Sequence, residues 1–179
     1  MCLSVNLGFH KVKNNKPIAL VAKQSILVYK VLEVKNKHYY TPYMLKSVNF
    51  DDEYGMFFYK TTRFSIDRVL PFYNQGREHR EYNVSRGIHS YIDLAKANCT
   101  NDWIRDCCCL NAIPNIHYAI IPKGSKFYIG DDGDIASSNL VVFENEAKYN
   151  KNKEYFGDKP IEFSEYLKEF GTELDSKKV

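Results

Sequence analysis

The sequence has no run of 18 or more apolar residues, so it predicts no membrane-spanning helix and no membrane partner. The polar stretch NNKP at residues 14–17 stands where a secretory signal needs an apolar run, and we expect no secretion through a signal peptide. Arginine is scarce, with six among 25 basic residues, and the formal net charge is only +3. Because arginine suits bidentate contacts with phosphates and base edges, we do not expect a nucleic-acid partner.

The cysteines follow no ligand or disulfide spacing. There are five, an odd number, and the adjacent trio Cys107 to Cys109 argues against a disulfide framework and for a reducing compartment. If extended, this trio points Cys108 away from its two neighbours, so a metal site would also need Cys99 or His117. No C-x2-C pair is present. Buried apolar cysteines explain the pattern better, and we expect no metal.

Cys2 has two interpretations. Removal of Met1 would leave an N-terminal cysteine whose own amine could act as the base, the arrangement of N-terminal nucleophile hydrolases. Those amidotransferases usually continue Met-Cys-Gly, whereas this chain has Leu3. We favour Cys2 as a small apolar anchor of the first strand.

Length and composition predict one domain. The chain has 179 residues, of which 44% are hydrophobic and 15% aromatic, enough for one core and short for two. We expect a single compact α+β domain with mostly antiparallel sheet, a short central helix and a C-terminal amphipathic helix. Residues 1–145 form the predicted core, and residues 146–179 a linker and a helix that packs on it.

Strand patterns dominate the first half. Residues 25–34, SILVYKVLEV, are rich in β-branched and aromatic residues, and KNK at 35–37 allows a reversal into HYYTPY, so we expect a hairpin with residues 26–32 buried. Residues 54–64 read as a second strand region. Pro71, Gly76 and a charge cluster predict that residues 69–83 form an exposed, mobile loop.

Helices and a meander are expected in the second half. Ser90 and Asp93 resemble a capping pair that opens a helix of two to three turns, with Tyr91, Leu94, Ala95 and Asn98 on one face. Residues 115–145 predict a meander of three antiparallel strands. A polar linker at 146–159 then leads to a helix from residue 160 to a stop at 171, and residues 172–179 should fray.

The stretch RGIHS is the first candidate site. In the predicted fold, the helix that begins at Ser90 offers unpaired N–H groups, Arg86 adds a positive charge, and Gly87 permits close approach of a bound group. An anion would then settle beside His89. The alternative is a structural histidine that braces the turn, with Arg86 in solvent. The turn DDGD at 131–134 lacks the further acidic ligands of a calcium loop and reads as a solvated turn.

Four blocks carry a family resemblance: MCLSVN, ILVYKVL, GIHSYIDLAKA and IIPKGSKFYIG with IASSNLVVFE. Together they resemble an uncharacterised family of small proteins from gut bacteria and their phages, over most of residues 1–144. No activity comes with that family. The implied location is the host cytoplasm or a virion.

The order of elements also resembles, more distantly, the ADP-ribosyltransferase-like fold. That resemblance implies an NAD cleft with Tyr29 and Lys30 on the first strand, His89 and Ser90 at the turn, and residues 137–139 on the late strand. An active transferase places a carboxylate on the late strand, but ASSN has none and Glu144 lies at its far end. Shared architecture alone does not carry function.

Two functions follow from these patterns. The first is a non-enzymatic phage-type protein that acts by contact with a viral or host protein, without a cofactor; its 14 tyrosines suit an interface. The second is an ADP-ribosyltransferase-like module, degenerate as an enzyme, that binds NAD or another nucleotide. The ligand-binding candidates are Tyr29, Lys30, Arg86, Gly87, His89 and Ser90.

Overall fold

A computed structural model describes residues 3–42, 46–61, 64–68, 72–74, 77–79, 82–107 and 113–175. The first strands are β1 (Leu3–Ser4), β2 (Val12–Lys13), β3 (Lys16–Pro17), β4 (Leu20–Val21), β5 (Ile26–Lys35), β6 (His38–Tyr40), β7 (Ser47–Val48), β8 (Met56–Lys60) and β9 (Ser65–Arg68). The later strands are β10 (Phe72–Asn74), β11 (Arg77–His79), β12 (Tyr82–Arg86), β13 (Ile88–Tyr91), β14 (Ile113–Ile121), β15 (Lys126–Ile129), β16 (Asp134–Ser137), β17 (Asn139–Phe143) and β18 (Ile161–Glu162). The helices are the 3-10 turn η1 (Leu7–Phe9), α1 (Leu94–Cys107), α2 (Glu146–Asn152) and α3 (Phe163–Asp175).

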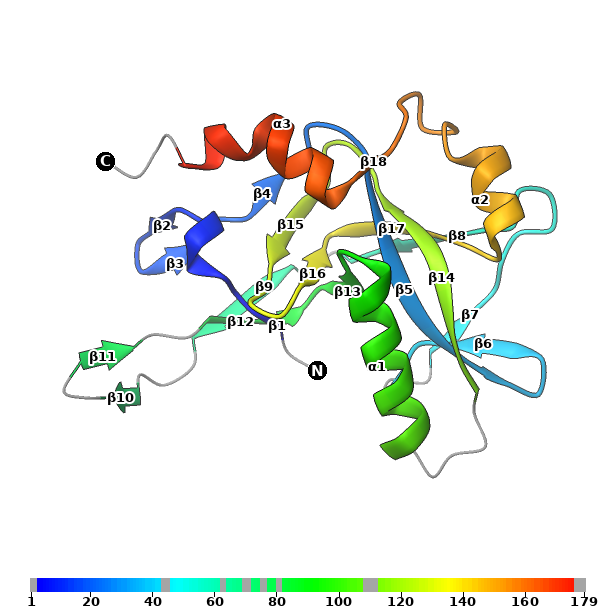
Figure 1. The fold of residues 1–179 in the computed structure, drawn as a ribbon, viewed down its shortest axis with the longest axis horizontal. Helices are drawn as coiled ribbons and strands as arrows, with labels where there is room; N and C mark the ends of the chain where they lie inside the picture. Colours follow the sequence, from blue (N-terminus) through cyan, green and yellow to red (C-terminus); the bar gives the residue numbers. More distant parts are fainter. Residues whose placement is uncertain are drawn as a thin grey trace.

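One large sheet organises this single compact domain. Its strands follow the order β4-β15-β16-β13-β5-β14-β17-β8, and every neighbouring pair in that order is antiparallel. Strand β18 pairs parallel with the start of β5. The three helices lie around this sheet (Figure 1). The domain contains more strand than helix, so it is mostly antiparallel sheet rather than an even α+β mixture.

Strand β5 is the centre of the sheet. It pairs with β14 from Ile26 to Val34, but with β13 only through the pair Tyr29 and Tyr91. The predicted hairpin is confirmed, since β5 returns into β6 through Asn36 and Lys37, both with positive φ. Two left-handed residues in a two-residue loop match the twist of an antiparallel pair. Residues 26–33 are buried, as expected for a central strand.

The two faces of the sheet bury different clusters. One face carries Val28, Leu32, Ile135 and Phe127, and α3 covers it with its own aromatic residues. The opposite face is covered in three parts: by Ala97 of α1, by Tyr149 of α2, and by the small sheet β1-β12-β9. Side chains that alternate along a strand therefore end in different clusters.

The predicted meander is partly wrong. Strands β15 and β16 form the expected hairpin around the DDGD turn, but β14 does not pair with β15. Instead β14 pairs with β5 and β17, while the far side of β15 pairs with β4. Turn residues mark where the chain reverses, whereas the choice of neighbour depends on contacts across the whole sheet.

The helix predicted to begin at Ser90 begins later. Ser90 lies in β13 opposite Ile135, and its side chain is fully buried. Asp93 caps α1, because its carboxylate accepts the Lys96 N–H at 2.7 Å. The helix has 14 residues rather than two to three turns. Its predicted apolar face is also wrong, since Leu94 is 45% exposed while Ala97 is buried.

The C-terminal segments differ from the prediction as well. The stretch expected to be a linker, residues 146–159, contains α2, whose first turn is capped by the Asn145 side chain accepting the Lys148 N–H. The strand β18 lies where the last helix was predicted to begin, so that helix starts at Phe163 rather than at residue 160. Helix α3 passes Gly171, where a stop was predicted, and residues 172–175 remain helical rather than frayed. Residues 176–179 lie outside the described chain.

The predicted mobile loop at 69–83 contains strand structure. Strands β10 and β11 form a hairpin that projects from the rest of the domain in Figure 1, and β12 pairs with β1 and β9. Tyr82 and Val84 of β12 are buried. Residues 69–71, 75–76 and 80–81 lie outside the described chain, so the prediction of mobility is not tested there.

Two alanine variants test where the first helix begins. We expect Asp93→Ala to lower the free energy of unfolding by about 1 kcal/mol, because the first turn of α1 loses its cap. We expect Ser90→Ala to cost less, because its buried hydroxyl has no hydrogen-bond partner in the protein. Urea denaturation measures both. A larger loss of unfolding free energy for Ser90→Ala than for Asp93→Ala would show that Ser90 is the cap.

Candidate functional site

The six residues named from the sequence do not form one site. Tyr29 and Lys30 are consecutive on β5, so their side chains point to opposite faces of the sheet. Tyr29 packs with Tyr91 and Ala97 under α1. Lys30 projects into the other face. One ligand on the surface cannot contact both side chains.

Lys30 and His89 do meet, but inside the protein. The Lys30 ammonium donates a hydrogen bond to the backbone carbonyl of His89. This contact lies where β13 leaves β5 after a single residue pair, so Lys30 bridges the two halves of the sheet. Burial lowers the pKa of Lys30 to about 8. Burial, with a smaller contribution from Lys30, lowers the pKa of His89 to about 4.

The ring of His89 is largely enclosed. Its Nδ1 atom is buried and has no hydrogen-bond partner in the protein. His89 stands opposite Ala136 of β16, in the middle of a strand rather than at a loop-to-helix junction. A neutral imidazole fits this environment, because a buried charge without a counter-ion is costly.

Arg86 and Gly87 are also placed differently from the expected anion site. Arg86 is exposed at the end of β12. A Cβ on Gly87 would approach Phe64, Ala136 and Val84 to 3.0–3.1 Å, so this glycine allows close packing of the two sheets. The N-terminus of α1 already holds the carboxylate of Asp93. The anion site was predicted wrongly because a carboxylate of the chain itself, that of Asp93, occupies the amides that were expected to bind an external anion.

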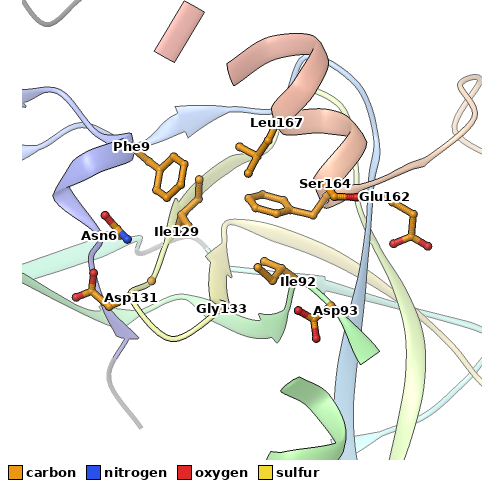
Figure 2. Close-up of a pocket in the computed structure, with 12 residues that line it drawn as sticks. Asn6, Phe9, Ile92, Asp93, Ile129, Asp131, Gly133, Glu162, Ser164 and Leu167 are labelled. Carbon is orange, nitrogen blue, oxygen red and sulfur yellow. The ribbon is translucent and has the colours of Figure 1, made fainter. Parts of the chain in front are cut away.

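A pocket of about 310 Å³ lies elsewhere, between η1, the β15–β16 turn, the segment before α1, and the start of α3. Its apolar lining comes from Phe9, Ile92, Ile129, Phe163 and Leu167. Figure 2 shows Phe9, Ile129 and Leu167 close together, with polar residues on either side of them. Those polar residues are Asn6 and Asp131 on one side and Asp93 and Glu162 on the other.

The rim of the pocket is acidic. Asp93, Asp131 and Glu162 are all exposed at its edge. Asp134 lies next to the lining residue Gly130. Burial, with smaller contributions from the charges of Asp132 and Asp131, raises the pKa of Asp134, while a backbone hydrogen bond and Lys96 oppose the rise. Partial burial and the neighbouring charge of Glu165 raise the pKa of Glu162. Burial is the larger cause of both rises, and the smaller contributions from Asp131, Asp132 and Glu165 show that carboxylates act on one another and create negative potential around this opening.

Helix termini weaken this potential without reversing it. The N-termini of α1 and α3 both lie at the pocket, and each contributes about half a positive charge. Asp93 caps α1, and Glu165 lies in the first turn of α3. Full carboxylate charges outweigh these partial charges, so the opening favours cations.

Tyr29 does not line the pocket, but the charge of the rim residue Glu162 acts on its hydroxyl group. Burial and the charge of Glu162 raise the pKa of Tyr29 to about 12. Tyr118 lies next to Tyr29, with ring centroids 5.6 Å apart, and stacks on Tyr149 of α2. Glu162 therefore separates the pocket from a tyrosine cluster on the other face of the sheet.

Sequence reasoning missed most of the pocket. The DDGD turn was interpreted as solvated, and its Asp131 and Gly133 do line the opening. Asn6 and Phe9 carried no signal in the sequence. Glu162 lies in the segment that was expected to begin the last helix. The available sequence signal was the presence of carboxylates in three short segments. This signal cannot be interpreted until the fold shows that the three segments lie together.

The other predicted residues show no metal site in the described part of the chain. His117 is buried, with its Nδ1 atom 3.0 Å from the Phe143 carbonyl oxygen and its ring stacked on Phe50. Cys99 is exposed on α1 and is not in a disulfide. Cys107 ends α1, while Cys2, Cys108 and Cys109 lie outside the described residues. No group of three or more potential ligands occurs among the residues described.

The described helices also include none that is long and apolar enough to cross a membrane. Comparisons of this chain with protein-family models, with curated proteins and with solved structures found no match.

Proposed function

We propose that this is a phage-type protein that acts by contact with another protein, of the virion or of the host, and not by catalysis. The pocket beside α3 is the observation that carries the proposal. It combines aromatic and aliphatic walls with charged residues at the edge, the arrangement that protein interfaces use to receive an anchoring side chain. Exposed Leu7, which lies in the chain between the lining residues Asn6 and Phe9, gives a partner further apolar surface.

The location of the titrating groups supports contact over catalysis. Lys30 and His89 have strongly displaced pKa values, but neither lines the pocket. A general acid or base must come within hydrogen-bond reach of its substrate. Lys30 and His89 are better explained as parts of the interior that join the two halves of the sheet.

Site-specific photo-crosslinking tests the contact. A benzophenone side chain at Ser164, an exposed position on the pocket lining, should yield one discrete covalent adduct with a protein in host cells during phage infection. The same group at exposed Glu154, outside the pocket lining, is the control. Mass spectrometry identifies the adduct. Equal, diffuse labelling at both positions would contradict a pocket-centred contact.

A nucleotide-binding, ADP-ribosyltransferase-like function is the second candidate. The early separation of β13 from β5 favours it, because a split between neighbouring strands is where that fold accommodates NAD. The lack of a carboxylate in residues 137–139 and the acidic rim of the pocket oppose it. Thermal shift with NAD separates the two, since a ligand at a hundredfold excess over its dissociation constant adds about 2.7 kcal/mol of stability.

A further inference from the structure

The lining of the pocket constrains the chemistry of its occupant. The floor is apolar, with buried Ile129 and Phe163 and partly buried Phe9, Ile92 and Leu167. The charged groups lie at the edge, in the carboxylates of Asp93, Asp131 and Glu162, and the other polar side chains of the lining are the uncharged Asn6 and Ser164. A complementary ligand therefore has an apolar stem and a positively charged end.

We propose that the pocket receives a lysine or arginine side chain from the protein partner, with the methylene stem on the apolar floor and the cationic end among the rim carboxylates. This inference rests on the contact function proposed above. Long basic side chains routinely cover apolar surface with their stems while the charge stays at the edge. Asp131 and Glu162 lie on opposite sides of the apolar floor, so a cation at either side meets a carboxylate (Figure 2).

The charge at the pocket is opposite in sign to that of the whole chain. The whole chain carries a formal net charge of +3, so a basic partner has no general attraction to it. At the pocket the balance is reversed, because Asp132, Asp134 and Glu165 add to the carboxylates of the rim. Lys96 is the cation whose charge acts on Asp134. A basic side chain of the partner is therefore drawn to this opening.

The size of the pocket agrees with one side chain. A volume of about 310 Å³ stands at the lower end of the range of roughly 300–1,000 Å³ that small-molecule sites occupy. It accommodates a lysine or arginine side chain with part of its backbone. The pyrophosphate of a dinucleotide would meet the carboxylates of the rim, which repel anions.

Capped tripeptides test the proposed chemistry directly. The probe is acetyl-Gly-Lys-Gly-amide, with the arginine equivalent beside it, titrated into the full chain labelled with ¹⁵N. We expect shifts of the backbone amides of Ile92, Ile129 and Leu167, with a dissociation constant of about 1 mM. The norleucine and acetyl-lysine peptides keep the stem without the charge and should bind at least about fivefold more weakly. Equal binding by all four peptides, or no shifts up to about 20 mM, overturns the proposal.

Matched charge variants locate the cation. The double variant Asp131→Asn and Glu162→Gln should weaken the lysine peptide about fivefold, while Asp93 is left intact as the cap of α1. The control is Asp52→Asn with Glu154→Gln, which removes two exposed carboxylates outside the pocket lining and should leave binding unchanged. Added salt should weaken binding to the wild type more than to the pocket variant. Equal losses in both variants overturn the assignment.

The two proposals fail in distinguishable ways. A crosslinked protein at Ser164 whose capture the lysine and arginine peptides do not inhibit would keep the contact and overturn the cationic anchor. Peptide binding that depends on Asp131 and Glu162, together with no adduct in infected cells, would overturn the contact as the function. Inhibition of the adduct by the lysine peptide, and not by norleucine, supports both.

Discussion

Acidification from pH 7 to pH 4 should reduce the free energy of unfolding by about 3 kcal/mol through His89. Burial lowers the pKa of this histidine to about 4, below its ordinary value of 6.5. Between these two values the unfolded chain binds more protons than the folded protein, so stability falls as the pH falls. The loss begins near pH 6.5 and is complete below pH 4. Urea denaturation at pH 7, 5.5 and 4 measures it.

The variant His89→Gln isolates this contribution. Burial also lowers the pKa values of His10 and His117, which act in the same direction, whereas burial raises those of Asp134 and Glu33, which act in the opposite one. All four groups remain in the variant, so the difference between the two pH profiles reports His89. Parallel profiles would contradict a buried neutral histidine at this position.

Local patterns predicted the pieces of chain whose partners are close in sequence. The hairpin of β5 and β6 was predicted because the apolar run ends at a polar Lys-Asn-Lys stretch, and Asn36 does take the left-handed conformation there. The β15–β16 hairpin around its acidic turn was predicted for the same reason. In both cases the turn residues and the two strands lie within about twenty residues, so the signal is complete in one window.

The position of Ser90 shows where local signals fail. Ser-x-x-Asp followed by apolar residues is a typical capping pattern, but Ile88 and Tyr91 are buried in the sheet and hold Ser90 in β13. Asp93 then supplies the cap three residues later. The burial of a strand between β5 and β16 outweighs a capping interaction of about 1 kcal/mol.

The pocket could not be predicted from the sequence, because its walls come from four separated segments. Phe9, Ile92, Ile129 and Leu167 meet only after β15, β16 and β13 are adjacent in the sheet and α3 lies across them. Each residue alone is an ordinary apolar position. Tyr29 was identified for a different reason, as part of an NAD cleft, and its place beside Glu162 follows from the parallel pair of β18 and β5.

Phe127→Ala should reduce the free energy of unfolding by about 3–5 kcal/mol. Phe127 is fully buried on β15, and its ring meets the ring of Tyr166 of α3 edge-on at 6.0 Å. Removing the ring leaves a cavity between the sheet and α3 and removes an aromatic contact. Helix α3 also supplies Phe163 and Leu167 to the pocket, so the variant should loosen one wall of the site. Urea denaturation at pH 7 measures the loss.

Hydrogen exchange and a matched phenylalanine separate this local effect from general damage. The Phe58→Ala variant removes the same ring from β8, where the side chain is 54% exposed, and should cost about 1 kcal/mol or less. In Phe127→Ala the amides of α3 should exchange faster than those of α1, because α1 packs on the opposite face. Equal losses of stability in both variants, or unchanged exchange in α3, would show that Phe127 does not hold α3 against the sheet. The lysine peptide should then bind the Phe127→Ala protein as well as the wild type, whereas a loosened α3 predicts weaker binding at the same acidic rim.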